Sequence, residues 1–117
     1  MNYIDEAKAE LAKHVQVGKG LMNVYTLLVL VKGEDTTLKD VHDAWALNIN
    51  KTWDKETNGE HFSLIPFDDL RDEVKYKDQK YVDAIHKTAV ALEHRNGQTF
   101  SRSNQKTFRC IYSSRFN

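Results

Sequence analysis

The stretch that most constrains this 117-residue chain runs from Val41 to Leu70. These thirty residues hold both tryptophans, the only proline and two of the five histidines. Pro66 drives the preceding residue, Ile65, out of the helical region, because the proline ring clashes with a helical backbone there. We therefore expect the indole of Trp45 to be pinned beneath a proline-bent segment, with a shallow aromatic notch at the edge of the contact.

Hydrophobic periodicity predicts a mainly α-helical fold, a small single-domain bundle of about four helices. A first helix is predicted by apolar residues at i, i+3, i+7 and i+11, namely Ile4, Ala7, Leu11 and Val15. The run from Leu21 to Val31 is apolar on nearly every side. Its β-branched residues are compatible with a strand, but its length and its leucines favour a helix buried on several sides. Gly33 follows as a left-handed helix end.

Thr37 and Asp40 have the spacing of a capping box, with Asp in place of the usual Glu. They predict a third helix, whose apolar face continues to Trp53. The polar residues 54–60 that follow are predicted to form an exposed turn.

The proline-containing segment comes next, and residues 62–65 are predicted to be extended because Pro66 follows them. The acidic pair Asp68 and Asp69 predicts the start of the last and longest helix, since negative charge is favourable at a helix N-terminus. We expect this helix to be broken near residues 76–78.

Charge divides the chain into two parts. Residues 1–93 carry 12 Lys/Arg against 17 Asp/Glu, a net charge of −5, whereas residues 94–117 carry five Lys/Arg and no acid. We expect a single helical domain over residues 1–93 and a basic tail over residues 94–117. The acidic domain argues against nucleic-acid binding, which needs a cationic face.

The origin and the structure of the tail stay open. Residues 107–116 have enough aromatic and apolar side chains to form a short β-strand. The preceding Leu92-Glu93-His94 resembles a common vector junction, so the tail is either natural or vector-derived, and either ordered or disordered. Aromatic residues between its cations would allow contact with nucleic acid or anionic surfaces, and a solvated segment is the alternative.

Compartment and membrane contact are indicated by what the sequence lacks. Cys110 is the only cysteine, so the fold forms without an internal disulfide, as in a reducing compartment. The N-terminus has neither the basic region nor the apolar stretch of a signal peptide. The apolar run of residues 21–31 is about half the length needed to cross a bilayer. We expect a cytoplasmic protein with no membrane partner.

An ordered set of residues spans positions 38–92: Val41-His42-Asp43-Ala44-Trp45-Ala46, Trp53, His61-x-Ser63-Leu64-Ile65-Pro66-Phe67-Asp68-Asp69-Leu70 and Glu73-x-Lys75-Tyr76-x-Asp78. This pattern resembles the ryanodine-receptor (RyR) repeat domain, which occurs in stand-alone and fused forms in bacteria and phages. Two positions depart from it: Thr52 replaces the usual glycine before the second tryptophan, and Phe62 replaces the proline after the histidine. The full span also looks like an uncharacterised family of short actinobacterial and phage proteins.

The resemblance implies a small helical domain that is not known as an enzyme. In bacteria such domains accompany defence and signalling modules and are thought to bind nucleotide-derived small molecules. We therefore expect a non-enzymatic module that senses or sequesters such a molecule, in bacterial defence or phage counter-defence. The alternative is a protein-interaction domain that self-associates through the apolar helix of residues 21–31.

The candidate ligand-binding residues are His42, Trp45, Trp53, Lys55, His61 and Lys75. His42 and Trp45 share a helical face at spacing i, i+3, so they would either stack a base and donate a hydrogen bond to it, or act structurally. In the structural interpretation, Trp45 is a core residue and His42 bonds a loop carbonyl that holds the Pro66 segment in position.

Trp53 and His61 flank the polar loop, where an indole and an imidazole would form a platform for a ligand or a purely structural contact. Lys55 or Lys75 would then meet a phosphate group.

Catalysis, metal binding and bound cofactors are not expected. The five histidines have no close ligand spacing, and Asp83-x-x-His86 alone is too common to indicate a metal site. The sequence contains no glycine-rich phosphate loop and no serine in a nucleophile elbow.

Overall fold

The computed structural model describes residues 1–96, and every regular element in that range is helical. The framework consists of α1 (Tyr3–Ala12), α2 (Lys19–Val31), α3 (Leu38–Thr52) and α6 (Gln79–Asn96). Shorter elements connect them: η1 (Gly33–Asp35), α4 (Lys55–Asn58), η2 (Phe67–Asp69), α5 (Asp72–Lys75) and η3 (Tyr76–Asp78). The expected helical bundle of about four main helices is confirmed. The β-pairing expected for residues 107–116 lies outside the described residues.

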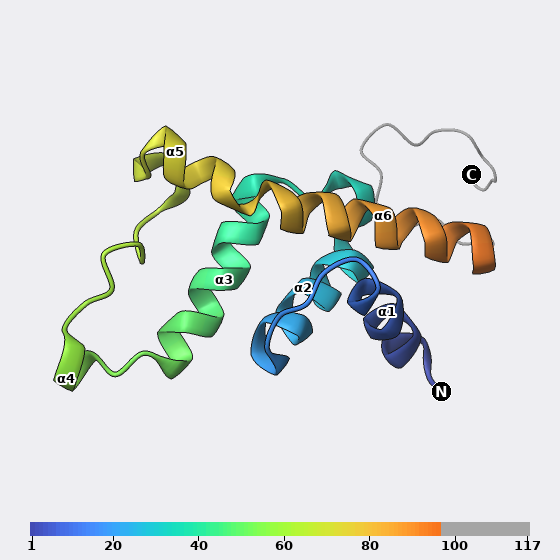
Figure 1. Ribbon diagram of the computed structural model, residues 1–117, viewed down its shortest axis with the longest axis horizontal. Helices are drawn as coiled ribbons and strands as arrows, with labels where there is room; N and C mark the ends of the chain where they lie inside the picture. Colours follow the sequence, from blue (N-terminus) through green and yellow to red (C-terminus); the bar gives the residue numbers. More distant parts are fainter. Residues whose placement is uncertain (97–117) are drawn as a thin grey trace.

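The longest described helix, α6, runs across α3, α2 and α1 in turn along its length (Figure 1). Helix α2 packs against α1, α3 and α6, so it lies at the centre of the bundle. Its position explains why its sequence is apolar on so many sides. No helix within residues 1–96 is both long and apolar enough to cross a membrane.

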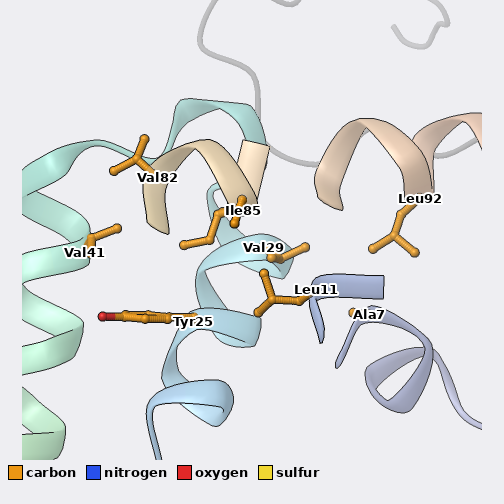
Figure 2. Close-up of a cluster of buried hydrophobic side chains, with 9 residues drawn as sticks. Ala7, Leu11, Tyr25, Val29, Val41, Val82, Ile85 and Leu92 are labelled. Atoms are coloured by element: carbon orange, nitrogen blue, oxygen red, sulfur yellow. The ribbon is translucent and has the colours of Figure 1, made fainter. Parts of the chain in front are cut away.

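The core forms where these four helices meet (Figure 2). Its buried apolar side chains are Ala7, Leu11, Tyr25, Val29, Val41, Val82, Ala84, Ile85 and Leu92. Leu92, near the end of α6, packs with the α1 residues of this cluster, whereas Val82 lies at the α3 end (Figure 2). The burial of these side chains is the main stabilising term for the fold.

Helix α1 begins at an Asn2 cap, whose side-chain oxygen accepts a hydrogen bond from the Asp5 backbone N–H at 2.8 Å. Ala7 and Leu11 are buried as the periodicity predicts, but Ile4 is 40% exposed. The helix ends at Ala12.

Helix α2 confirms the helical interpretation of the run from Leu21 to Val31. It ends before Gly33, whose φ of 53° is the left-handed conformation expected there. At the other end, a β-carbon on Gly20 would collide with the side chain of Asn48, so the glycine allows α2 to approach α3 closely.

Helix α3 begins with the predicted capping box. The Thr37 hydroxyl accepts from the Asp40 N–H at 3.2 Å, and the Asp40 carboxylate accepts from the Thr37 N–H at 2.9 Å. Only Val41 and His42 of this helix are buried. Its C-terminal half extends away from α6 beside the segment that leads from α4 to α5 (Figure 1). That segment and α3 together frame the candidate site.

Two local predictions for this segment are wrong. Residues 62 and 63 form a turn and Ile65 a bend, so residues 62–65 are not an extended stretch, and the Leu64 N–H donates to the His61 carbonyl at 3.0 Å. Asp68 and Asp69 lie in η2 and do not start the long helix, because buried Leu70 adopts an extended conformation after them. The helical path resumes at α5, and the break predicted near residues 76–78 is present as η3.

Candidate functional site

His42 connects α3 to the proline-bent segment. Its Nε2–H donates a hydrogen bond to the Ile65 carbonyl at 2.7 Å, and the side chain is buried, with 4% of the residue exposed. This bond satisfies a carbonyl that the proline leaves outside any helix or sheet. The structural interpretation of His42 is thereby confirmed, since the imidazole holds the segment beside Pro66 against α3. The accompanying prediction that Trp45 is a core residue is wrong, because Trp45 is only partly buried and lies outside the buried cluster.

Four of the predicted site residues lie next to one another in an aromatic row: His42, Trp45, His61 and Trp53. The rings of His42 and Trp45 are stacked, with centroids 5.7 Å apart and an interplanar angle of 26°. The imidazole of His61 then meets both indoles edge-on, at 5.3 Å from Trp45 and 4.6 Å from Trp53. Such contacts each add about 0.5–1.5 kcal/mol beyond area burial. Through His61, the row joins the loop after α4 to Trp45 on α3 and to Trp53 at the end of that helix.

The loop after α3 is ordered by its own hydrogen bonds. The Trp53 indole N–H donates to the Gly59 carbonyl at 2.7 Å, and Asp54 caps the short α4. His61 Nδ1 accepts from the Ser63 N–H at 3.0 Å, so the proton of the neutral imidazole is on Nε2. The polar groups of Trp53 are therefore already used within the loop, and the platform expected there has no free indole N–H.

The two predicted lysines lie apart from each other. Lys55 is exposed on α4. Lys75, on α5, places its ammonium 5.2 Å from the centroid of the Phe67 ring, a cation–π contact. The centroid of the Phe67 ring lies 6.2 Å from that of His42, so Lys75 contacts a residue next to the aromatic row and not the row itself.

One hollow of about 350 Å³ opens beside the aromatic row, and we call it the α3–α5 hollow. It is lined by His42, Trp45, Phe62, Ser63, Arg71, Val74, Lys77 and Asp78. Its volume is within the range of small-molecule sites. A second hollow, between α3 and residues 64–66, shares His42 as a lining residue. Of the predicted site residues, only His42 and Trp45 line the α3–α5 hollow.

Aromatic faces and charged groups line this hollow together. Phe62 is 84% exposed, and its ring is stacked on that of His61 at 5.1 Å. Arg71 is also exposed, with a 3.7 Å ion pair to Glu73 at the surface. Because Arg71 and Lys77 outnumber Asp78, the hollow is a locally cationic place in an acidic domain.

Asp78 lies at the end of η3, half-buried between the hollow and the core. Burial raises the pKa of Asp78 above its ordinary value, and electrostatic interactions with His42, Lys80 and Lys77 only partly offset that effect. On the core side, burial and the charge of Asp78 raise the pKa of the Tyr25 hydroxyl. Within residues 1–96, no hydrogen bond or ion pair to the Asp78 carboxylate is present.

Sequence reasoning missed Phe62, Arg71, Lys77 and Asp78 as lining residues. Asp78 could have been predicted, since it is the last residue of the Glu-x-Lys-Tyr-x-Asp element that resembles the RyR repeat domain. Phe62 stands where that pattern usually has a proline, which gives no signal of a lining residue. No grouping of three or more His, Cys, Asp or Glu side chains suited to a metal ion occurs among the described residues.

Comparison with known proteins assigns the chain to a family. Residues 1–90 match the family described as Domain of unknown function (DUF7701), and the chain belongs to that family. The match contains the whole aromatic row and every residue that lines the α3–α5 hollow. No curated protein and no solved structure matched the chain.

Proposed function

We propose that this chain is a non-enzymatic binding module that takes a nucleotide-derived small molecule into the α3–α5 hollow. The observation that carries the proposal is the presence of two aromatic rings, Trp45 and Phe62, and two cations, Arg71 and Lys77, around one hollow. A nucleotide combines a flat base with an anionic phosphate, so it requires these two kinds of group side by side.

The aromatic groups would serve the base. Stacking of a base on an aromatic side chain contributes about 1–3 kcal/mol and requires no particular base. An exposed phenylalanine such as Phe62 gains by being covered, because its apolar surface then leaves water.

The cations would serve the phosphate. Arg71 offers a planar guanidinium that suits phosphate oxygens in pairs, and Lys77 a compact ammonium. Both lie in a domain whose net charge is −5 over residues 1–93, so they are a local exception that favours an anion.

The proposal includes no chemical step. Among the described residues, His42 is the only imidazole that lines the hollow, and its Nε2–H donates to the Ile65 carbonyl. The resemblance to the RyR repeat domain supports the same class of ligand and a role in bacterial defence or phage counter-defence. The single cysteine supports our proposal that the protein acts in the reducing cytoplasm.

Calorimetric titration with nucleoside monophosphates, cyclic nucleotides and ADP-ribose tests the proposal. We expect saturable binding at or below millimolar ligand, weakened about 3–10-fold by Lys77→Gln. Lys55→Gln is the matched control, because it removes the same charge from an exposed position outside the hollow. Absence of heat with every ligand, or equal loss in both variants, contradicts binding in this hollow.

Self-association is the alternative function, and one observation favours it. Leu27 and Val31, one turn apart on α2, are 55% and 53% exposed. A second copy of the chain could cover them by packing α2 against α2. Light scattering decides this point: a dimer mass that Leu27→Lys reduces to a monomer supports self-association, and a monomer at all concentrations opposes it.

A further inference from the structure

Asp78 lines the hollow with a carboxylate that no protein group satisfies. The residue is partly buried, and no residue in the described part of the chain donates a hydrogen bond to its carboxylate. Its oxygens are therefore left to water in the hollow. A ligand that displaces this water must bring donors of its own, because an acceptor left without donors costs affinity.

The ligand group that binds this carboxylate is not a cation. Arg71 and Lys77 line the same hollow and repel a positively charged ligand. The donor must therefore be a neutral N–H or O–H group of a molecule that is flat enough for the rings of Trp45 and Phe62.

Among the common bases, guanine presents two parallel donors on one edge, its N1–H and its exocyclic N2 amine. A carboxylate accepts both at once, because an ionised carboxylate offers acceptors only. Adenine and cytosine present one donor beside an acceptor nitrogen, which a carboxylate repels. Uracil presents a single donor between two carbonyls.

We infer that Asp78 selects guanine as the base of the bound nucleotide, accepting from N1–H and N2–H while Trp45 and Phe62 stack on the ring and Arg71 and Lys77 meet the phosphate. This inference rests on the proposed function and names the ligand more closely. Asp78 is then a specificity-determining residue, comparable in action to any buried acceptor that rejects a ligand lacking the matching donor.

Titration of the full chain with GMP, IMP and AMP tests the inference without any variant. IMP keeps N1–H and lacks the exocyclic amine, and AMP lacks both guanine donors. Loss of one hydrogen bond to a charged group corresponds to roughly a tenfold or greater loss in affinity. We expect GMP to bind about tenfold more tightly than IMP, and AMP to bind more weakly still.

Asp78→Asn provides the second arm, with Asp83→Asn as its control. Asn offers one acceptor and one donor, which suit the adenine edge, so GMP affinity should fall roughly tenfold or more while AMP affinity rises. Asp83 lies on the exposed side of α6, where its carboxylate accepts a hydrogen bond from the Gln79 side chain, and its variant should keep the preference for GMP.

The failures of the two proposals are distinguishable. Binding of AMP or IMP as tight as that of GMP overturns the selection by Asp78 and leaves nucleotide binding standing. Unchanged GMP affinity in Asp78→Asn, with the variant folded by thermal melting, also overturns it. If no nucleotide binds at all, the proposed function fails and the inference fails with it.

Discussion

His42 on α3 and Ile65 before Pro66, 23 residues apart in sequence, are joined by a 2.7 Å hydrogen bond from an imidazole N–H to a backbone carbonyl. This bond determines where the segment after α4 lies, and so where Phe62 and Ser63 stand relative to Trp45. The α3–α5 hollow exists because α3 and this segment are held together at that point.

Replacement of His42 by alanine should therefore affect both stability and the hollow. The variant loses a buried hydrogen bond, leaves the Ile65 carbonyl unsatisfied and removes the ring stacked on Trp45. We expect a loss of about 2–4 kcal/mol of unfolding free energy. Thermal melting should show this as a fall in Tm of several degrees per kcal/mol. A variant as stable as the wild type would mean that the segment is held by other contacts.

Trp53→Phe tests the loop after α3. Phenylalanine keeps an aromatic ring beside His61 but cannot donate to the Gly59 carbonyl. Because this bond is at the surface, we expect a loss of only about 0.5–1.5 kcal/mol. The visible effect should be local, with faster proteolytic cleavage within residues 54–60 while the core melts almost unchanged. Equal cleavage rates in the two proteins would show that α4 and its Asp54 cap are sufficient to order the loop.

Glu10 links α1 to the end of α6 and should make stability depend on pH. Burial alone would raise the pKa of Glu10, but hydrogen bonds from Lys13, His14 and Arg95 outweigh it and lower the pKa below the ordinary value of 4.5. The stabilisation is therefore complete well above pH 4.5 and is lost as pH falls through the lower, folded-state pKa.

Glu10→Gln measures this contribution. At pH 7 the variant should be less stable by about 1–2 kcal/mol, since it loses charge-assisted bonds to partly exposed partners. The difference from wild type should shrink as pH falls from 5 towards 3 in chemical denaturation experiments. A difference independent of pH would show that the carboxylate charge is not involved.

Asp78→Asn should change stability at pH 7 in the opposite direction to Glu10→Gln. Because the pKa of Asp78 is raised in the folded state, its contribution to stability is present at low pH and is lost as pH rises through the raised pKa. At pH 7 the neutral amide avoids the cost of the buried charge, so the variant should unfold at a slightly higher temperature than wild type. A clearly lower Tm would indicate that Asp78 supports the fold, and would weaken its assignment to a ligand.

Much of the framework was predictable because its signals are local. The capping box at Thr37 and Asp40 and the left-handed Gly33 depend on a few neighbouring residues, and both are present. The contact of His42 with a carbonyl beside Pro66 was also predictable, because a proline-bent segment needs a donor from outside itself.

The hollow was harder to predict because it depends on tertiary packing. Arg71 and Asp78 lie at the ends of single helical turns, whose direction is determined by the burial of Leu70 and the contact of η3 with α3. Neither effect leaves a periodic pattern in the sequence. Lys55 is close to Trp53 in sequence, yet it lies exposed on α4 and does not line the hollow.

The two indole N–H signals provide the most direct test of the central claim. The chain has only two tryptophans, and only Trp45 lines the α3–α5 hollow. In a proton–nitrogen correlation spectrum, with signals assigned through Trp45→Phe and Trp53→Phe, GMP should shift the Trp45 indole saturably and leave Trp53 nearly unmoved. A saturable shift of Trp53 alone, or no shift of either indole at millimolar GMP, would contradict binding in the hollow.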